Sequence, residues 1–236
     1  MLMKEIYRGK AKTVYEDGNE VVIEFRDDIT AFDAVKHNQI KGKGFYNAQT
    51  SAKLFELLEN NNIKTHYIGM DDDRRMRAKR VEIIPLEVIV RNTAAGSITK
   101  NYPIKEGKEF EKPVILFDLK NDAYHDPLLN EDVAEALGVS NREEMNDMRN
   151  ISLRVNDVLK SFFAEHKIKV VDFKLEFGRY KNELLVADEI SCDTCRFWNE
   201  KNESLDKDLY RFDKGDVLAG YKRIYDIVTS SIETQS

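Results

Sequence analysis

The chain is poor in cysteine and has no stretch rich enough in glycine, proline or serine to form a linker. Its two cysteines form a single C-x-x-C pair, Cys192 and Cys195. A structural zinc site needs four ligands, and no second cysteine pair could complete one. A thioredoxin-like pair would lie near a βαβ unit, whereas this pair follows a predicted hairpin strand. We therefore expect two reduced thiols in a reducing compartment.

Long hydrophobic runs and an excess of positive charge are also missing. No apolar run approaches the ~20 residues of a membrane-spanning helix, and the N-terminal "MLMKEIYRGK" lacks the apolar core of a signal peptide. The 43 acidic side chains outnumber the 37 basic ones, for a net charge of −6, which argues against a nucleic-acid scaffold. We expect a cytoplasmic protein with no membrane or nucleic-acid partner, in which a local basic pocket could bind a phosphorylated small molecule.

The order of the sequence patterns predicts an α+β fold. Antiparallel strands are expected over residues 4–35, and the apolar spacing of residues 47–63 is typical of a helix. Strands and helices do not alternate regularly, as they would in a doubly wound parallel sheet. We predict a small β-rich lobe over residues 1–85 and a larger α+β lobe over residues 86–236. A cleft between two such lobes is a common ligand site.

A long helix is predicted after residue 140. Ser140 and Glu143 have the spacing of a capping box, and the apolar residues that follow recur at steps of three and four. These residues are Met145, Met148, Ile151, Val155, Val158 and Phe162. We interpret this stripe as core, and we expect a C-terminal helix from about Gly215.

The segment "VVDFKLEFGRYKNELLVADEIS" is predicted to be a hairpin with acidic residues in both strands. Its period of two puts Val171, Phe173, Leu175 and Phe177 on one buried face and Asp172, Lys174 and Glu176 on the other. If the hairpin folds about Asn182, Glu176 lies across from Asp188, which Glu189 follows. Like charges placed in this way destabilise a sheet. Either nearby cations such as Lys174 neutralise the acids, or a magnesium ion bridges them to nucleotide phosphates.

A glycine turn near the N-terminus could bind phosphate. In "YRGKAKTVY", Gly9 lies between two short β-like runs and is followed by Lys10 and Lys12. Backbone N–H groups at such a turn, together with two ammonium groups, suit a nucleotide's phosphates, although the Walker pattern is absent. A plain hairpin turn with solvated lysines is the alternative.

Other polar stretches allow both a substrate-binding and a purely structural interpretation. In "VIVRNTAAGS", Arg91 with Ser97 and the turn amides could hold a phosphate or carboxylate, or Arg91 could pair with an acid at the strand end. In "LKNDAYHDP", His125 could be a general base or could make a structural hydrogen bond. The remaining candidates are Lys120, Asp122, Arg196, Lys207 and Arg211, each of which could instead be an ordinary surface charge.

Taken in order, these motifs resemble the SAICAR synthetase family (phosphoribosylaminoimidazole-succinocarboxamide synthase) from about Ile6 to Tyr221. The motifs are "YRGKAKTVY", "VIVRNTAAGS", "LKNDAYHDP", "VDFKLEFG", "ADEISCDTCRFW" and "LDKDLYRFD". The resemblance implies a ligase of purine biosynthesis that joins the carboxylate of CAIR, an aminoimidazole ribotide, to the amine of L-aspartate, using ATP and Mg²⁺. It also implies a protein-kinase-like layout and a homo-oligomer, most often a dimer.

The resemblance further implies a role for each matched residue. Nucleotide binding falls to Gly9, Lys10 and Lys12 at the phosphates and to the backbone around Val81 and Ile83 at adenine, with Glu176 and Asp188 as magnesium ligands. Substrate binding falls to Arg91, Ser97 and Arg196 at the ribotide, to Lys120, Asp122 and His125 on the aspartate side, and to Lys207 and Arg211 on a mobile loop. Lys12, Lys174 and Asp172 are the catalytic candidates, the last two beside the CAIR imidazole and carboxylate.

The chain departs from the family pattern at two positions. Cys192 replaces a common proline, so the turn after the metal strand is expected to be less rigid, and Asn199 replaces an acid.

A small-molecule or protein kinase would use the same ATP cleft, but kinases usually carry an H-R-D-like string that this chain lacks. A nucleotide-sensing module without turnover is the non-enzymatic alternative.

Overall fold

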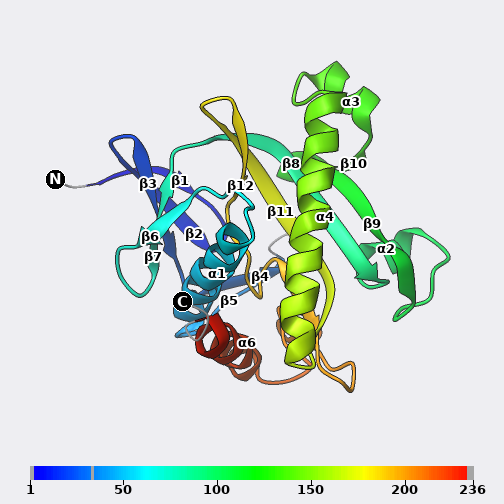
Figure 1. The fold of residues 1–236 in the computed structure, drawn as a ribbon. Coiled ribbons are helices and arrows are strands. Elements are labelled where there is room, and N and C mark those ends of the chain that lie inside the picture. Colours follow the sequence, from blue (N-terminus) through cyan, green and yellow to red (C-terminus); the bar gives the residue numbers. More distant parts are fainter. Residues whose placement is uncertain (1–2, 33–34, 233–236) are drawn as a thin grey trace.

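Two antiparallel sheets and a short hairpin contain the strands of the computed structural model, which describes residues 3–32 and 35–232 (Figure 1). The first sheet has the strand order β1-β2-β3-β7-β6. Its strands are β1 (Lys4–Arg8), β2 (Lys12–Asp17), β3 (Glu20–Phe25), β6 (Tyr67–Met70) and β7 (Arg75–Lys79). The separate hairpin is made of β4 (Asp28–Ala31) and β5 (Lys36–Gln39). The antiparallel strands expected near the N-terminus are therefore confirmed.

The second sheet has the order β10-β9-β8-β11-β12, and β13 also pairs with β11. Its strands are β8 (Glu82–Thr93), β9 (Glu109–Leu119), β10 (Leu128–Leu129), β11 (Lys169–Tyr180), β12 (Glu183–Ala187) and β13 (Cys195–Trp198). The chain passes from one sheet to the other between Lys79 and Glu82. One continuous hydrophobic core includes side chains from both sheets, so the division into lobes at residue 85 stays a prediction.

Helices cover the second sheet and fill the space beside the first. They are α1 (Lys43–Asn60), α2 (Ser97–Asn101), the 3₁₀ helix η1 (Asp122–Tyr124), α3 (Glu131–Leu137), α4 (Arg142–Glu165), α5 (Asp208–Arg211) and α6 (Val217–Ile232). Figure 1 shows α4 running across the second sheet, with α1 and α6 packed beside each other. This mixed architecture confirms the predicted α+β class. None of the helices in the described ranges is both long and apolar enough to span a bilayer.

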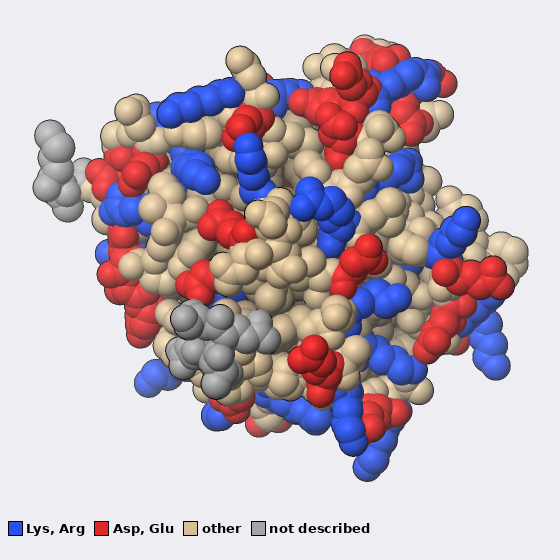
Figure 2. Space-filling model, in the orientation of Figure 1, with Lys and Arg blue, Asp and Glu red and all other residues tan. Residues whose placement is uncertain are grey.

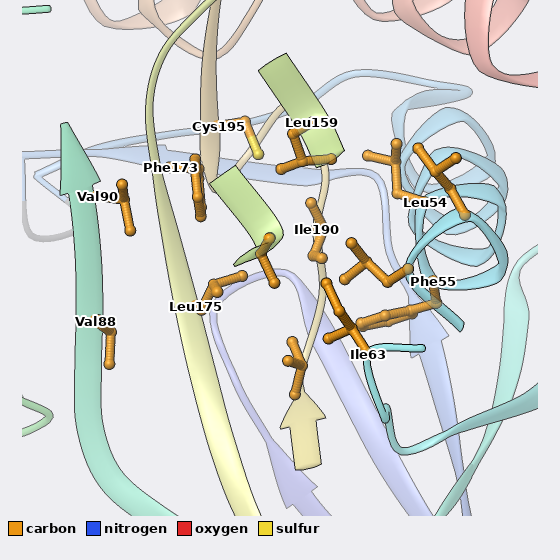
Figure 3. Close-up of a cluster of buried hydrophobic side chains, with 14 of the residues drawn as sticks. Leu54, Phe55, Ile63, Val88, Val90, Leu159, Phe173, Leu175, Ile190 and Cys195 are labelled. Carbon is orange, nitrogen blue, oxygen red and sulfur yellow. The ribbon is translucent and has the colours of Figure 1, made fainter. Parts of the chain in front are cut away.

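The core lies where α1, α4 and the central strands β8 and β11 meet. Figure 3 shows Leu54 and Phe55 of α1 near Ile190, and Phe173 and Leu175 of β11 in the same cluster. The predicted apolar face of β11 is buried throughout. The stripe predicted for α4 also faces inward, with Met145, Met148, Val155 and Phe162 buried and Ile151 and Val158 partly buried.

Several local predictions need correction. The N-cap of α4 is Asn141, whose side chain accepts a hydrogen bond from the Glu144 backbone N–H. Ser140 instead donates its hydroxyl to the Glu144 carboxylate, so the capping box predicted at Ser140 and Glu143 is wrong by one residue. The C-terminal helix begins at Val217, which agrees with the predicted start at about Gly215. The polar face of β11 is also largely buried, because it lines a cavity rather than the protein surface.

A buried ion pair fastens the start of α1 to the segment that follows β12. Lys43 Nζ lies 2.5 Å from Asp193 Oδ2, and Tyr221 of α6 donates its hydroxyl to Asp193 Oδ1 at 2.7 Å. The Lys43 side chain is 1% exposed. Burial opposes the ionisation of Asp193, but the Lys43 charge holds the pKa of this carboxyl below its usual value. The pair therefore joins three elements through one charged contact.

Ion pairs on the surface, unlike the buried Lys43–Asp193 pair, are exposed to water. Figure 2 shows acidic and basic side chains interspersed over the face that it presents. Lys64 and Glu183, for example, form an ion pair at 2.5 Å with both side chains exposed. Pairs of this kind contribute little to stability because water and salt screen them.

We predict that Lys43→Met lowers the free energy of unfolding by roughly 3–5 kcal/mol, because it leaves the Asp193 carboxylate buried without its cation. Lys64→Met is the matched control, and its expected loss is below about 1 kcal/mol. Urea unfolding of both variants measures the difference. Equal losses in the two variants would contradict the importance of the buried pair.

Candidate active site

A cavity of about 1170 Å³ lies between the first and second sheets. Its walls come from the turn between β1 and β2, the β4–β5 hairpin, strands β8 and β11, the segment after β12, and α5. Single ligand pockets usually measure about 300–1000 Å³. The cavity is therefore large enough for more than one small molecule.

The cavity brings together almost every residue predicted for the site. Its lining includes Gly9, Lys10, Lys12, Val81, Ile83, Arg91, Lys120, Asp122, Asp172, Lys174, Glu176, Asp188, Arg196, Lys207 and Arg211. Two predicted residues are not part of the wall. Ser97 lies behind it and accepts a hydrogen bond from Arg91 Nη2 at 2.8 Å. His125 follows η1 with a positive φ of 57°.

The glycine turn forms one wall. Gly9 donates its backbone N–H to the Lys12 carbonyl at 2.9 Å and thereby closes the turn between β1 and β2. Lys10 reaches across to Asp122, 2.8 Å away. Lys12 contacts Asp188 and lies 2.8 Å from Glu189 Oε1. Burial lowers the pKa of Lys12, but these carboxylates outweigh it and raise that pKa above its usual value, so the side chain stays a cation.

The two acids of the β11–β12 hairpin face this turn, although their register differs from the prediction. Glu176 pairs with Ala187, so Asp188 lies one residue beyond the position directly across from it. Lys181 and Asn182 both have positive φ, which gives a two-residue loop rather than a turn about Asn182. Asp188 has φ of 64°, a left-handed conformation that aspartate tolerates better than most residues.

Lysines from three different elements surround these acids. Glu176 lies 2.5 Å from Lys120 Nζ and 3.7 Å from Lys174 Nζ, and its side chain is only 4% exposed. Burial and the neighbouring Asp188 charge raise the pKa of Glu176. Burial also opposes ionisation of Asp188, but Lys12 and Lys120 lower its pKa to about 2. The cations proposed as the simpler alternative are thus present.

The donor set fits a hard divalent cation as well. Carboxylate oxygens are the protein ligands that Mg²⁺ prefers, and it commonly takes one or two of them together with water and phosphate oxygens. The cluster also contains more acids than lysines. Its members are the acids Glu87, Glu176, Asp188 and Glu189 and the lysines Lys12, Lys120 and Lys174. No group of three or more potential ligands is arranged for a metal within the described chain, so phosphate or water would have to complete the coordination.

Two arginines form the opposite side of the cavity, and one carboxylate joins them. Asp172 Oδ2 lies 2.8 Å from both Arg91 Nη1 and Arg196 Nη1. Arg91 also donates to the Ala95 carbonyl at 2.8 Å. Gly96 has φ of 66°, and a Cβ there would lie 2.7 Å from Arg196 Nη2. Glycine at this turn therefore lets the second guanidinium approach the first.

The α5 segment brings the last predicted cations into the cavity. The carboxylate of Asp206 accepts the backbone N–H groups of Phe197 and Asp208, both at 2.8 Å, and thus fixes the start of this segment. Arg211 lies 2.6 Å from Asp208. Within the described ranges the ammonium group of Lys207 makes no hydrogen bond or ion pair, although the Asp193 charge acts on it. Burial lowers the pKa of Lys207, and a bound anion would favour its charged form.

Sequence reasoning missed some of the charged residues in the wall. Glu87 pairs directly across from Glu176 in the sheet and contacts Lys174. It is the single acid within the apolar run "PLEVIV", which is a signal that could have found it. The sequence assigns no role to Glu189. It carries no local signal for Asp193, because the buried partner Lys43 is 150 residues away in sequence.

Comparisons with known proteins show which family this chain matches. The model of the SAICAR synthetase family matches residues 5–228. The phosphoribosylaminoimidazole-succinocarboxamide synthase of Methanocaldococcus jannaschii is 56% identical over 220 residues, covering 92% of this chain and 91% of the relative. That of Methanococcoides burtonii is 52% identical over 227 residues, covering 95% of each. Among solved structures, a SAICAR synthetase in complex with ADP is 47% identical, with a TM-score of 0.93 over 96% of this chain and 98% of that one. The resemblance found in the motifs is confirmed, and the chain belongs to the SAICAR synthetase family.

Proposed function

We propose that the cavity joins CAIR to L-aspartate by way of an acyl phosphate. As a member of its family, the chain is an ATP-dependent ligase of purine biosynthesis. A carboxylate is a poor acyl donor, because its leaving group would be oxide, whereas an acyl phosphate releases phosphate. The observation that carries the proposal is that one cavity holds a lysine-bearing glycine turn, a carboxylate pair and two arginines joined by an acid.

The nucleotide occupies the side of the cavity nearest the first sheet. Gly9, Lys10 and Lys12 contact its phosphates, and the backbone around Val81 and Ile83, at the start of β8, contacts adenine. The ADP complex of a related enzyme supports nucleotide binding by this fold. Glu176 and Asp188 would hold Mg²⁺, which when bound neutralises phosphate charge and positions the transferred group.

CAIR occupies the side with the paired arginines. Arg91 and Arg196 hold the ribotide phosphate, because guanidinium groups bind phosphate with two parallel hydrogen bonds, and Ser97 orients Arg91. Asp172 and Lys174 lie beside the imidazole and its carboxylate. Lys174 and Lys12 stabilise the charge that develops as the carboxylate oxygen attacks the γ-phosphorus and ADP leaves.

The aspartate amine then attacks the acyl carbonyl, the carbon–oxygen bond to the phosphoryl group breaks, and the departing phosphate accepts the proton that the amine loses. The ammonium group of Lys207 and the guanidinium of Arg211 offer cations to an aspartate carboxylate from α5. Lys120 and Asp122 line the cavity beside Glu176 and Lys10, and we place the remaining aspartate contacts there. His125, from the same loop but outside the wall, is the third candidate for these contacts. Excluding water protects the acyl phosphate from hydrolysis, and the segment bearing Lys207 and Arg211 is suited to close the cavity.

We also propose a cytoplasmic homo-oligomer, most simply a dimer. The interspersed surface charge supports a protein that stays in water (Figure 2). The absence of a suitable spanning helix in the described ranges agrees with this. Size-exclusion chromatography with light scattering measures the assembly directly.

The reaction is tested by ADP release from purified protein with Mg²⁺, ATP and CAIR, with and without L-aspartate, and with products identified by mass. We expect ADP and SAICAR in equal amounts, and SAICAR only when aspartate is present. ADP release that is indifferent to aspartate would indicate a kinase or an uncoupled hydrolase. Nucleotide binding without any turnover would indicate a sensing module and contradict the proposal.

The metal assignment predicts the effect of Glu176→Gln. This change keeps the shape of the side chain but removes a charge that Mg²⁺ would need, so we expect turnover to fall by about 100-fold or more, as for loss of a principal electrostatic contribution. Glu183→Gln, on the exposed end of the same hairpin, is the matched control and should retain full activity. Steady-state rates over a range of Mg²⁺ concentrations test both variants, and melting curves verify their folding. Near-normal turnover of Glu176→Gln would remove Glu176 from the metal site.

A further inference from the structure

The backbone carbonyls of the glycine turn have a single side chain as their partner. Arg26, which directly follows β3, donates from Nη2 to the carbonyl oxygens of Gly9 and Lys10, at 2.8 and 3.2 Å. Its own backbone N–H donates to the Ala11 carbonyl at 2.8 Å. Three successive carbonyls of the turn are therefore directed toward one residue.

This contact also orients the turn's donors. In a trans peptide the C=O of one residue and the N–H of the next point in opposite directions. Because the Gly9 and Lys10 carbonyls face Arg26, the N–H groups of Lys10 and Ala11 face away from it. Gly9, Lys10 and Ala11 all line the cavity, whereas Arg26 does not. The Ala11 N–H has no hydrogen-bond acceptor among the described residues, so it is free to bind an anion.

Arg26 is itself held on two further sides. Its Nη1 donates to the hydroxyl of Thr13 at 2.7 Å, and its Nε donates to Asp28 Oδ2 at 2.9 Å. Thr13 is fully buried, and the Arg26 side chain is 21% exposed. The planar guanidinium thus spans the turn, β2 and β4 at the same time, a geometry that a lysine ammonium cannot reproduce.

We propose that Arg26 is a positioning residue that pre-organises the glycine turn for nucleotide phosphates. It contacts neither the cavity nor a substrate, and it acts by fixing the peptide planes that present the Lys10 and Ala11 N–H groups. Asp28 anchors the guanidinium to the β4–β5 hairpin. This inference rests on the proposed use of the turn for nucleotide phosphates.

The β4–β5 hairpin, to which Asp28 anchors Arg26, also contacts the α5 segment on another side of the cavity. Lys36 of β5 donates to the Tyr210 carbonyl of α5 and to Asp213, both at 2.7 Å. The Phe32 ring lies 6.2 Å from the Phe212 ring in an edge-on arrangement. Arg26 therefore holds the turn against a hairpin that also contacts the α5 segment.

Calorimetric binding of Mg²⁺–ADP to Arg26→Lys tests the proposal without requiring turnover. Lysine keeps the charge but loses the fork of hydrogen bonds, so we expect the Kd to rise at least about tenfold. The KM for ATP should rise in parallel, while the KM for CAIR changes less than about twofold, because the arginine pair is untouched.

Arg77→Lys is the matched control, because Arg77 lies on β7 of the same sheet and contacts Asp17, Glu20 and Asp71 outside the cavity. The Arg77→Lys substitution should leave the Kd for Mg²⁺–ADP unchanged. Arg26→Ala provides a second variant, in which added guanidinium ion at concentrations that do not unfold the protein should restore part of the nucleotide affinity. The same addition to Arg77→Ala should restore nothing.

The outcomes separate this inference from the proposed function. Unchanged nucleotide affinity in folded Arg26→Lys, or equal losses for nucleotide and CAIR together with a lower melting temperature, would overturn the positioning role alone. Failure of the wild type to bind Mg²⁺–ADP would overturn the proposed function and this inference together.

Discussion

The structure depends on balancing the charge of carboxylates that are buried between two sheets. An unpaired ionised carboxylate in a protein interior costs several kcal/mol, which is a large fraction of a protein's net stability. Glu176 and Asp188 avoid this cost because Lys12 reaches them from the first sheet and Lys120 and Lys174 reach them from the second. The ion pairs that make the acids tolerable therefore also hold the two sheets around one cavity.

Charge balance also holds together the side of the cavity that the two arginines form. Arg91 and Arg196 would repel each other in a dry wall, and Asp172 between them turns that repulsion into two ion pairs. The polar groups of the cavity are thus fixed before any ligand arrives, which removes most of the reorganisation that binding and catalysis would otherwise require. When a polyanion binds, the lysines and arginines of the cavity can contact it in place of the carboxylates, without first having to move into position.

The sequence was informative where a pattern is local and misleading where geometry depends on a neighbour. Alternation predicted both faces of β11, and the order of motifs identified the family. The register of the hairpin was wrong by one residue because two positive-φ residues, Lys181 and Asn182, form its loop. The cap of α4 shifted similarly, since Ser140 and Asn141 are equally good capping types. The pairing of Asp193 could not be found locally, because its partner Lys43 lies in a distant segment.

Strand β11 explains why core and site are inseparable in this fold. Phe173 and Leu175 point into the hydrophobic core, and the residues between and beside them, Asp172, Lys174 and Glu176, point into the cavity. Because side chains alternate along a strand, a slip of one residue would exchange the two sets and bury charges among apolar groups. The hydrophobic core thus fixes the register of β11, and the register places the acids and the lysine in the cavity. The site is precise because the core permits no other alignment.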